Sequence, residues 1–356
     1  MSMPECGARV LSYVDALREG ITQEMARDPS VLLFGLDVDD HKAIQGSTRG
    51  LVDRFGPERV FGTPLSEDAM TGVAIGAAMT GLRPIHVHIR NDFLMLAMNQ
   101  IVNVAAKAHS MYGGRVSVPL VIRSIIGKSW GQGAQHSQAL YPLFMHVPGL
   151  KVVLPSTAHD AKGCMIAAIR DDNPVIFIEH RLLYFTETEV PEAPYAVEPG
   201  RARICAAGDA ATVVGISNAA RDCLRARALL QDTGITCEVI DPIWLSPLDT
   251  DTILASAART KRLLVVDNGW TTCGAGAEII ARVLERAGPG AGIQVDRMGF
   301  APTPCPTTPW LEADFYPQPE RIARKVLCMV TGRDDDWTPN AAARQQSEDI
   351  AFKGPF

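Results

Sequence analysis

The sequence predicts an α/β protein of two domains. Its 356 residues exceed the size of one ordinary domain, which holds about 100–200 residues. Apolar residues make up 47 % of the chain and aromatic residues only 6 %, while 30 glycines suit close contacts between helices and sheets. Short apolar runs alternate with segments of helical periodicity in both halves. This alternation favours mainly parallel sheets with helical crossovers over an all-β sandwich.

The first predicted domain covers residues 1–185. Its short apolar runs predict strands at 31–36, 83–88, 118–123, 150–154 and 175–178, and its helical periodicities predict helices at 10–25, 63–81, 93–109 and 157–170. Thr63 is the expected cap of the helix over 63–81, with Pro64 at its first position. The glycine-rich polar segment 125–136 is too long for a simple connection and is expected to be a functional loop.

A linker and a second domain follow. Residues 186–201 contain several Glu and Pro with little periodicity, which predicts a linker. The second domain, 202–330, has predicted strands at 212–216, 237–240 and 263–266, and predicted helices at 219–230, 250–258 and 276–287. Residues 331–356 are polar, and we expect a tail that is frayed or docked on a partner.

Charge and cysteine usage exclude several classes of protein. The 34 basic and 40 acidic residues give a net charge of −6, so nucleic acid is not an expected partner. The eight cysteines form no C-x-x-C pair and no zinc-ligand spacing, which favours buried, reduced thiols. No apolar run reaches about 18 residues and the N-terminal residues lack an apolar signal segment, so we expect a cytoplasmic protein that does not interact with membranes.

The chain has no G-x-G-x-x-G fingerprint after a strand, no P-loop, no H-E-x-x-H and no G-x-S-x-G motif. It does hold a series of distinctive stretches in order, at 62–67, 72–84, 100–103, 133–138, 146–153, 168–175, 269–270, 274–279 and 316–322. In these stretches the chain resembles the β subunit of the thiamine-diphosphate-dependent 2-oxo acid dehydrogenases, of the pyruvate and branched-chain type. The resemblance covers about residues 8–330.

The resemblance implies an N-terminal pyrimidine-binding domain and a transketolase C-terminal-like domain. It also implies an α₂β₂ heterotetramer with thiamine diphosphate between the chains. The β chain would hold the aminopyrimidine ring, and an α-type chain would hold the diphosphate through Mg²⁺ and a Gly-Asp-Gly…Asn motif. This sequence has only Gly208-Asp209-Ala210, without the downstream Asn pair. We therefore expect half of an active site, completed by an α partner.

Glu67 is the expected catalytic residue. Taken alone, it would be an acid in the first turn of a helix, stabilised by about 0.3–1 kcal/mol by the helix dipole. The resemblance implies instead a buried carboxylate hydrogen-bonded to ring N1′, where burial helps it share a proton. Leu65, Ile89 and Phe93 match the residues that contact the pyrimidine, although each could equally be a core residue. His136 is implied in substrate binding or acyl transfer.

A potassium site is also implied by the resemblance. The matching positions bind K⁺ in some family members, largely through backbone carbonyls, which are suitable hard oxygen ligands. These positions are Leu120, Ala168, Ile169, Asp171 and Asn173.

The chain departs from the family pattern beside the cofactor. Family members usually have a stretch close to Glu-Phe-Met-Thr-Phe-Asn-Phe at 87–93, whereas this chain has Val-His-Ile-Arg-Asn-Asp-Phe, preceded by His86. His86, His88 and Arg90 alternate along a strand, so they could face one way and bind a phosphate or carboxylate. The alternative is that Arg90 and Asp92 form a structural ion pair. The loop also differs at Lys128, Ser129 and Trp130.

Three functions remain open from the sequence. The first is a β subunit that decarboxylates a 2-oxo acid and passes the acyl group to a lipoyl-acyltransferase. The second is a transketolase-like transfer of a two-carbon glycolyl unit from a ketose phosphate to an acyl carrier protein. The third is an inactive assembly subunit, against which the presence of Glu67, Phe93 and His136 argues.

Overall fold

The computed structural model describes residues 9–40, 42–127, 131–333 and 337–350. The chain divides into two compact units, Met1–Ile126 with Leu143–Pro199, and Gly127–Pro142 with Gly200–Phe356. The glycine-rich loop, which the sequence analysis places in the first domain, groups with the second unit. Lys128, Ser129 and Trp130 lie outside the described residues.

The first unit contains a parallel sheet, as the sequence predicts. Its strands lie in the order β6–β7–β5–β4–β2–β3 and all pair in parallel. They are β2 (Val31–Gly35), β3 (Val60–Gly62), β4 (Arg83–His88), β5 (Val121–Ile126), β6 (Lys151–Val153) and β7 (Val175–His180). Most of their residues are buried, as expected of a parallel sheet that is covered on both faces. All carboxyl ends therefore meet at one edge, where α/β proteins place their ligands.

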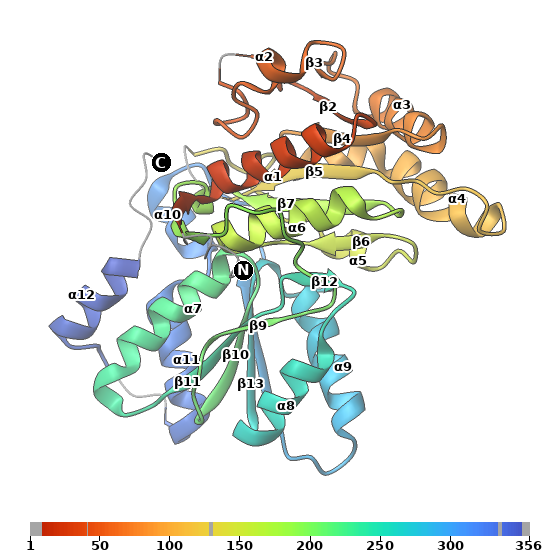
Figure 1. Ribbon diagram of the computed structural model, residues 1–356. Coiled ribbons are helices and arrows are strands. Elements are labelled where there is room, and N and C mark those ends of the chain that lie inside the picture. Colours follow the sequence, from red (N-terminus) through yellow and green to blue (C-terminus); the bar gives the residue numbers. More distant parts are fainter. Residues whose placement is uncertain (1–8, 41, 128–130, 334–336, 351–356) are drawn as a thin grey trace, which may run out of the picture. The chain divides into compact units, whose positions relative to one another are not determined.

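Helices and two short strands complete this unit. The helices are α1 (Tyr13–Arg27), α2 (Leu51–Phe55), α3 (Glu67–Met79), η1 (Asn91–Ala97), η2 (Gln100–Ala105), α4 (Ala106–Met111), α5 (Pro142–Met145), α6 (Ala158–Arg170) and η3 (Arg181–Leu183). Helices α1 and α6 pack side by side (Figure 1). The strands β1 (Arg9–Ser12) and β8 (Glu187–Val190) pair antiparallel with each other. Residues 187–190, inside the predicted linker, thus form a strand.

Three predicted helices differ from the structure. The helix expected at 10–25 begins only at Tyr13, because Ser12 caps it by accepting a hydrogen bond from the Asp15 amide. The helix expected from Thr63 begins at Glu67, since the Thr63 amide still bonds to the Gly35 carbonyl and keeps that backbone extended. The single helix expected at 93–109 is a 3₁₀ segment (η1), a π segment (η2) and a short α-helix (α4). Over a few turns, side-chain periodicity barely distinguishes these helix types.

The second unit is built on a five-stranded sheet in the order β14–β13–β10–β11–β9, parallel except for β9. Its strands are β9 (Arg203–Ala206), β10 (Ala211–Gly215), β11 (Cys237–Asp241), β13 (Arg262–Trp270) and β14 (Gln294–Phe300), with the short β12 (Trp244–Ser246) nearby in sequence. Its helices are α7 (Asn218–Leu229), η4 (Leu230–Thr233), α8 (Thr250–Thr260), α9 (Ala275–Ala287), α10 (Pro309–Phe315), α11 (Pro319–Thr331) and α12 (Ala341–Ile350). The predicted strands and helices of this half are all present.

The polar C-terminal segment forms a helix rather than a frayed tail where the structure describes it. Helix α12 packs on α7 of its own unit, and Ala343 and Ser347 are buried there. The Arg225 Nε donates to the Ser347 carbonyl at 3.2 Å. The cap of α12 is Asn340, whose side chain accepts from the Ala343 amide at 2.8 Å. The contact of α12 with α7 is made by small residues on a mostly polar helix. A helix of this kind has no long apolar stripe, so the sequence pattern did not predict it.

The cysteines largely follow the prediction. All seven cysteines among the described residues are free thiols, and Cys6 lies outside those residues. Cys164, Cys223, Cys237 and Cys305 are buried, but Cys273 is exposed, so burial was predicted too broadly.

Candidate active site

Four of the predicted site residues follow two strands of the first unit's sheet, at its carboxyl edge. Leu65 and Glu67 lie at the start of α3, just after β3, and Ile89 and Phe93 follow β4. Helix α3 packs on β4 and on η1, so the segments that carry the two pairs are neighbours. Glu67, Ile89 and Phe93 are half-buried, and Leu65 is 72 % exposed. One carboxylate among partly open apolar side chains suits an aromatic ring with a polar edge, such as an aminopyrimidine.

The predicted burial of Glu67 is not reached in the single chain. Its side chain is only half-buried, because Leu65 and the start of α3 face outward. Exposed apolar side chains continue from this point along α3, η1, η2 and α4: Leu65, Val73, Met79, Leu82, Leu96, Val104, Met111 and Tyr112. An apolar face of this extent is typical of a surface that another chain covers. In the single chain, Glu67 is therefore open to a partner or a cofactor.

His86 and His88 lie on one face of β4, as the strand alternation predicts. Their ring centroids are 4.3 Å apart, and the His86 ring also lies 5.0 Å from that of Phe34. Burial lowers the pKa of His86 to about 4, and burial followed by the neighbouring His86 lowers that of His88 well below its usual value. Both imidazoles are therefore neutral near pH 7. This corrects the expected anion clamp, because Arg90 is then its one charged member.

Arg90 follows β4 directly and is 8 % exposed. Its carbonyl accepts from the amide of Phe93 at 3.2 Å, which ties it to one of the predicted cofactor contacts. Its charge also acts on the buried Tyr184: burial and Glu179 raise the pKa of this phenol, while Arg123 and Arg90 oppose the rise. Arg90 thus lies in the interior at the carboxyl edge, beside the predicted pyrimidine contacts.

His136 is half-buried in the glycine-rich loop, which belongs to the second unit. Its amide donates to the Gly133 carbonyl at 3.4 Å. The glycines are required here: Gly131 and Gly133 have φ of 61° and 67°, and a Cβ would lie 2.8 Å and 2.6 Å from atoms of Thr307. The loop therefore presses against Thr307, and this contact shapes the backbone that carries His136.

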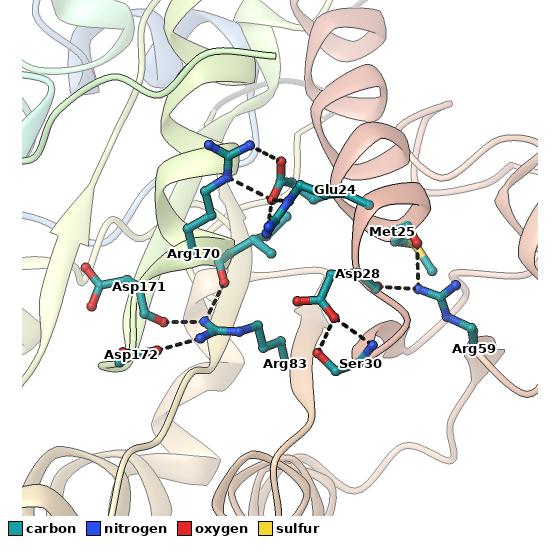
Figure 2. A network of polar contacts seen from close by, with 11 residues as sticks. Glu24, Met25, Asp28, Ser30, Arg59, Arg83, Arg170, Asp171 and Asp172 are labelled. Atoms are coloured by element: carbon teal, nitrogen blue, oxygen red, sulfur yellow. Dashed lines mark hydrogen bonds and ion pairs between the residues drawn. The ribbon is translucent and has the colours of Figure 1, made fainter.

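The five residues expected to bind K⁺ do not form an open cation site. The Arg83 Nη1 donates to the carbonyls of Ile169 and Asp171, at 3.0 and 3.1 Å, and Figure 2 shows this guanidinium facing both Asp171 and Asp172. The Leu120 carbonyl accepts from the Val175 amide, and that of Ala168 from the Asp171 amide. The Asp171 carboxylate pairs with Lys151 and accepts from Asn173.

A positively charged guanidinium among these oxygens opposes a second cation at the same place. The sequence could not reveal this, because backbone ligands leave no side-chain signature. In the part of the chain that the structure describes, no cluster of three or more His, Cys, Asp or Glu could hold a metal ion.

Two groups near the site were missed by the sequence analysis. Thr71, one turn after Glu67, lies 3.2 Å from His88, measured from Oγ1 to Nε2. The available signal for this contact was Thr71 itself, a polar residue at the start of a run of small apolar residues. The second group is the fully buried ion pair of Arg123 and Glu179, whose nitrogen–oxygen distances are 2.6 and 2.9 Å. The available signal was a single charged residue of each sign inside two mainly apolar strands.

No described helix has the length and apolar character needed to cross a membrane.

Comparison with known families agrees with this geometry. Residues 9–186 match the transketolase pyrimidine binding domain, and residues 200–322 match the transketolase C-terminal domain. Two solved structures share the fold. A split gene transketolase, described as an inactive β4 tetramer, covers 91 % of this chain and 99 % of its own, at 22 % identity and a TM-score of 0.72. A transketolase from Leishmania mexicana, 48 % of which is covered, has 15 % identity and a TM-score of 0.66.

Closer sequence relatives are β subunits of dehydrogenases. The chain is 43 % identical over 335 residues to the β subunit of acetoin:2,6-dichlorophenolindophenol oxidoreductase from Cupriavidus necator, covering 91 % of this chain and 99 % of the relative. It is 44 % identical over 273 residues to the pyruvate dehydrogenase E1 component subunit beta of Rickettsia felis, covering 77 % and 84 %. The chain therefore belongs to the transketolase-like family of 2-oxo acid dehydrogenase E1 β subunits.

Proposed function

We propose that this chain is the β subunit of a thiamine-diphosphate-dependent enzyme that decarboxylates a 2-oxo acid and passes the acyl group to a lipoyl carrier. The observation that carries the proposal is the position of Glu67 and Leu65 at the start of α3, next to the segment that carries Ile89 and Phe93, at the carboxyl edge of a parallel sheet. The names of the relatives, an acetoin oxidoreductase and a pyruvate dehydrogenase, support this reaction class.

Each residue would have a distinct task. When bound, thiamine diphosphate supplies a carbon nucleophile and an electron sink. Glu67 would hold a proton shared between its carboxylate and ring N1′. Leu65, Ile89 and Phe93 would contact the ring and exclude water from that carboxylate. His136 would act on the substrate or in acyl transfer.

The proposal includes an α-type chain that holds the diphosphate through Mg²⁺, in an α₂β₂ assembly. It rests on the exposed apolar face along α3 and α4, and on Gly208-Asp209-Ala210, which lacks the rest of the Mg²⁺-binding motif. The acyl acceptor would be a lipoyl-acyltransferase. K⁺ at the five expected positions stays a prediction, and Arg83, which donates to the carbonyls of Ile169 and Asp171, would have to release them for the ion.

A transketolase-like transfer of a glycolyl unit to an acyl carrier protein is the second candidate. The observation that favours it is the charged Arg90 beside Phe93, at a position where the family pattern has no charge.

The assembly can be tested with the chain alone. We expect the purified chain to bind no thiamine diphosphate in calorimetric titration with Mg²⁺, because it lacks the diphosphate half of the site. Co-expression with its α partner should yield an α₂β₂ particle by light scattering that binds the cofactor. Tight binding by the lone chain would contradict the shared site.

The donor can be tested through Arg90. A charge-assisted hydrogen bond to a phosphate or carboxylate contributes roughly 1.5–3 kcal/mol, about ten- to hundred-fold in affinity. If Arg90 binds the phosphate of a ketose phosphate, Arg90→Ala should raise KM for that donor by this factor, much more than for pyruvate, which carries no phosphate. The exposed Arg282→Ala serves as a control. Comparing kcat/KM for a ketose phosphate, pyruvate and 2-oxoisovalerate also separates the two candidate reactions, and a clear preference for 2-oxoisovalerate would refute the role of Arg90.

A further inference from the structure

Helix α3 lies on the sheet through small side chains. Its buried residues are Thr71, Ala74, Ile75 and Ala78, which recur every three or four positions and so form one face. Gly72 lies within this run, and a Cβ built there would come 3.7 Å from Gln100 of η2. Contacts between small apolar groups hold the helix on the sheet, but they are non-directional. They therefore only weakly fix the rotation of the helix about its axis and its position along that axis.

A directional contact is present at one position of this face. The Oγ1 of Thr71 lies 3.2 Å from the Nε2 of His88 at the end of β4. Thr71 is fully buried and His88 is 4 % exposed. Because Thr71 follows Glu67 by four residues, the two side chains lie one above the other on the same side of α3. The bond to the sheet thus acts one turn from the proposed catalytic carboxylate.

His86 holds the ring of His88 in place. The Nδ1 of His86 lies 3.4 Å from the carbonyl oxygen of Phe34, to which it can donate, and its ring meets that of His88 edge-on. Burial keeps both rings neutral, as described above. A threonine hydroxyl can both donate and accept, so the Thr71–His88 bond forms with either tautomer of a neutral imidazole.

We propose that Thr71 and His88 are positioning residues, whose hydrogen bond fixes helix α3 on β4 and thereby places the Glu67 carboxylate for its proton transfer. This inference rests on the proposed function. Misplacement of a catalytic group by 1 Å can cost about 10²-fold in rate, so a small rotation of α3 is sufficient to matter. The remainder of the contact, being apolar and small, would keep the helix folded on the sheet without that bond.

The test uses the enzyme co-expressed with its α partner and loaded with thiamine diphosphate and Mg²⁺. The readouts are the rate of H/D exchange at the cofactor C2, and kcat and KM for the best 2-oxo acid. We expect Thr71→Val, which keeps the shape and removes the hydroxyl, to slow exchange and kcat about tenfold, with KM within twofold. Thr71→Ser, which keeps the hydroxyl, should retain the wild-type exchange rate. His88→Phe should behave like Thr71→Val.

The double variant Thr71→Val/His88→Phe gives a thermodynamic cycle. Each single variant leaves one buried polar group without its partner, whereas the double variant removes both, so its melting temperature should be closer to wild type than the sum of the two losses predicts. Thr212→Val is a matched control, because Thr212 is also fully buried and bonds to Ser256 and Thr260, but in the second unit. It should lower the melting temperature without slowing C2 exchange.

Two outcomes separate this inference from the proposed function. If Glu67→Gln slows C2 exchange but Thr71→Val exchanges at the wild-type rate, the positioning role is wrong and the pair is structural only. If Glu67→Gln itself leaves exchange unchanged, the proposed role of Glu67 fails. If His88→Phe does not assemble, the comparison of Thr71→Val with Thr71→Ser decides whether the hydrogen bond matters. Serine keeps the hydroxyl group of Thr71, whereas valine replaces it by a methyl group.

Discussion

Replacing Glu67 by Gln should leave the fold and the assembly intact while slowing C2 proton exchange by about two to four orders of magnitude. That range is typical for loss of a positioned general acid–base group. The amide has the shape of the carboxylate but cannot share a proton with ring N1′. Glu67 is half-buried at the first position of α3, so the neutral side chain should be accommodated without strain. The measurement is H/D exchange at C2 in the assembled, cofactor-loaded enzyme.

The adjacent acid supplies a matched control. Asp68 carries the same charge one position further along the helix, is exposed, and accepts a 3.4 Å hydrogen bond from Gln100. Asp68→Asn makes the same change of charge near the same helix N-terminus, and it should alter the exchange rate less than twofold. Equal slowing in both variants would indicate a general effect of negative charge at the helix end, and wild-type exchange in Glu67→Gln would remove the carboxylate from the mechanism.

The architecture was accessible from the sequence because parallel strands carry a strong local signal. The runs around Val121, Val175 and Leu263 are continuous and apolar, since these strands are covered on both faces, and the structure places a strand at each. The short pair β1–β8 left no such signal. The two strands pair over a separation of about 180 residues, as in Arg9 with Val190, which no local window detects.

The site was predictable only in part, for a related reason. The resemblance assigned roles to Leu65, Glu67, Ile89 and Phe93, and the structure places all four just after β3 and β4, two strands of one parallel sheet. Burial and protonation were not predictable from residue type. His86 and His88 were expected to help bind an anion together with Arg90, but burial lowers the pKa of both imidazoles, which are therefore neutral near pH 7. The K⁺ site stays a prediction, and nothing in the sequence indicated that Arg83 donates to two of its carbonyls, those of Ile169 and Asp171.

Loss of the buried partner of Arg123 should be the most damaging single change to the stability of the first unit. Arg123 on β5 and Glu179 on β7 are both fully buried and joined by two hydrogen bonds. Ser47 accepts a further bond from the guanidinium at 3.0 Å, and Tyr184 donates to Glu179 at 2.7 Å. The carboxylate thus neutralises a cation that has no access to water. Glu179→Leu leaves that charge uncompensated, which costs about 3–5 kcal/mol.

The cost should fall when both charges are removed together. Arg123→Met/Glu179→Leu replaces the pair by apolar groups of similar size, and such exchanges are often close to neutral. Amide hydrogen exchange of the β5 and β7 strands measures the local free energy of opening without assuming that both units unfold together. The exposed pair of Arg282 and Glu278 is the control, and Glu278→Gln should change stability by less than about 0.5 kcal/mol. If Glu179→Leu costs no more than the double variant, the stability of this unit does not depend on charge compensation, and packing alone holds β5 against β7.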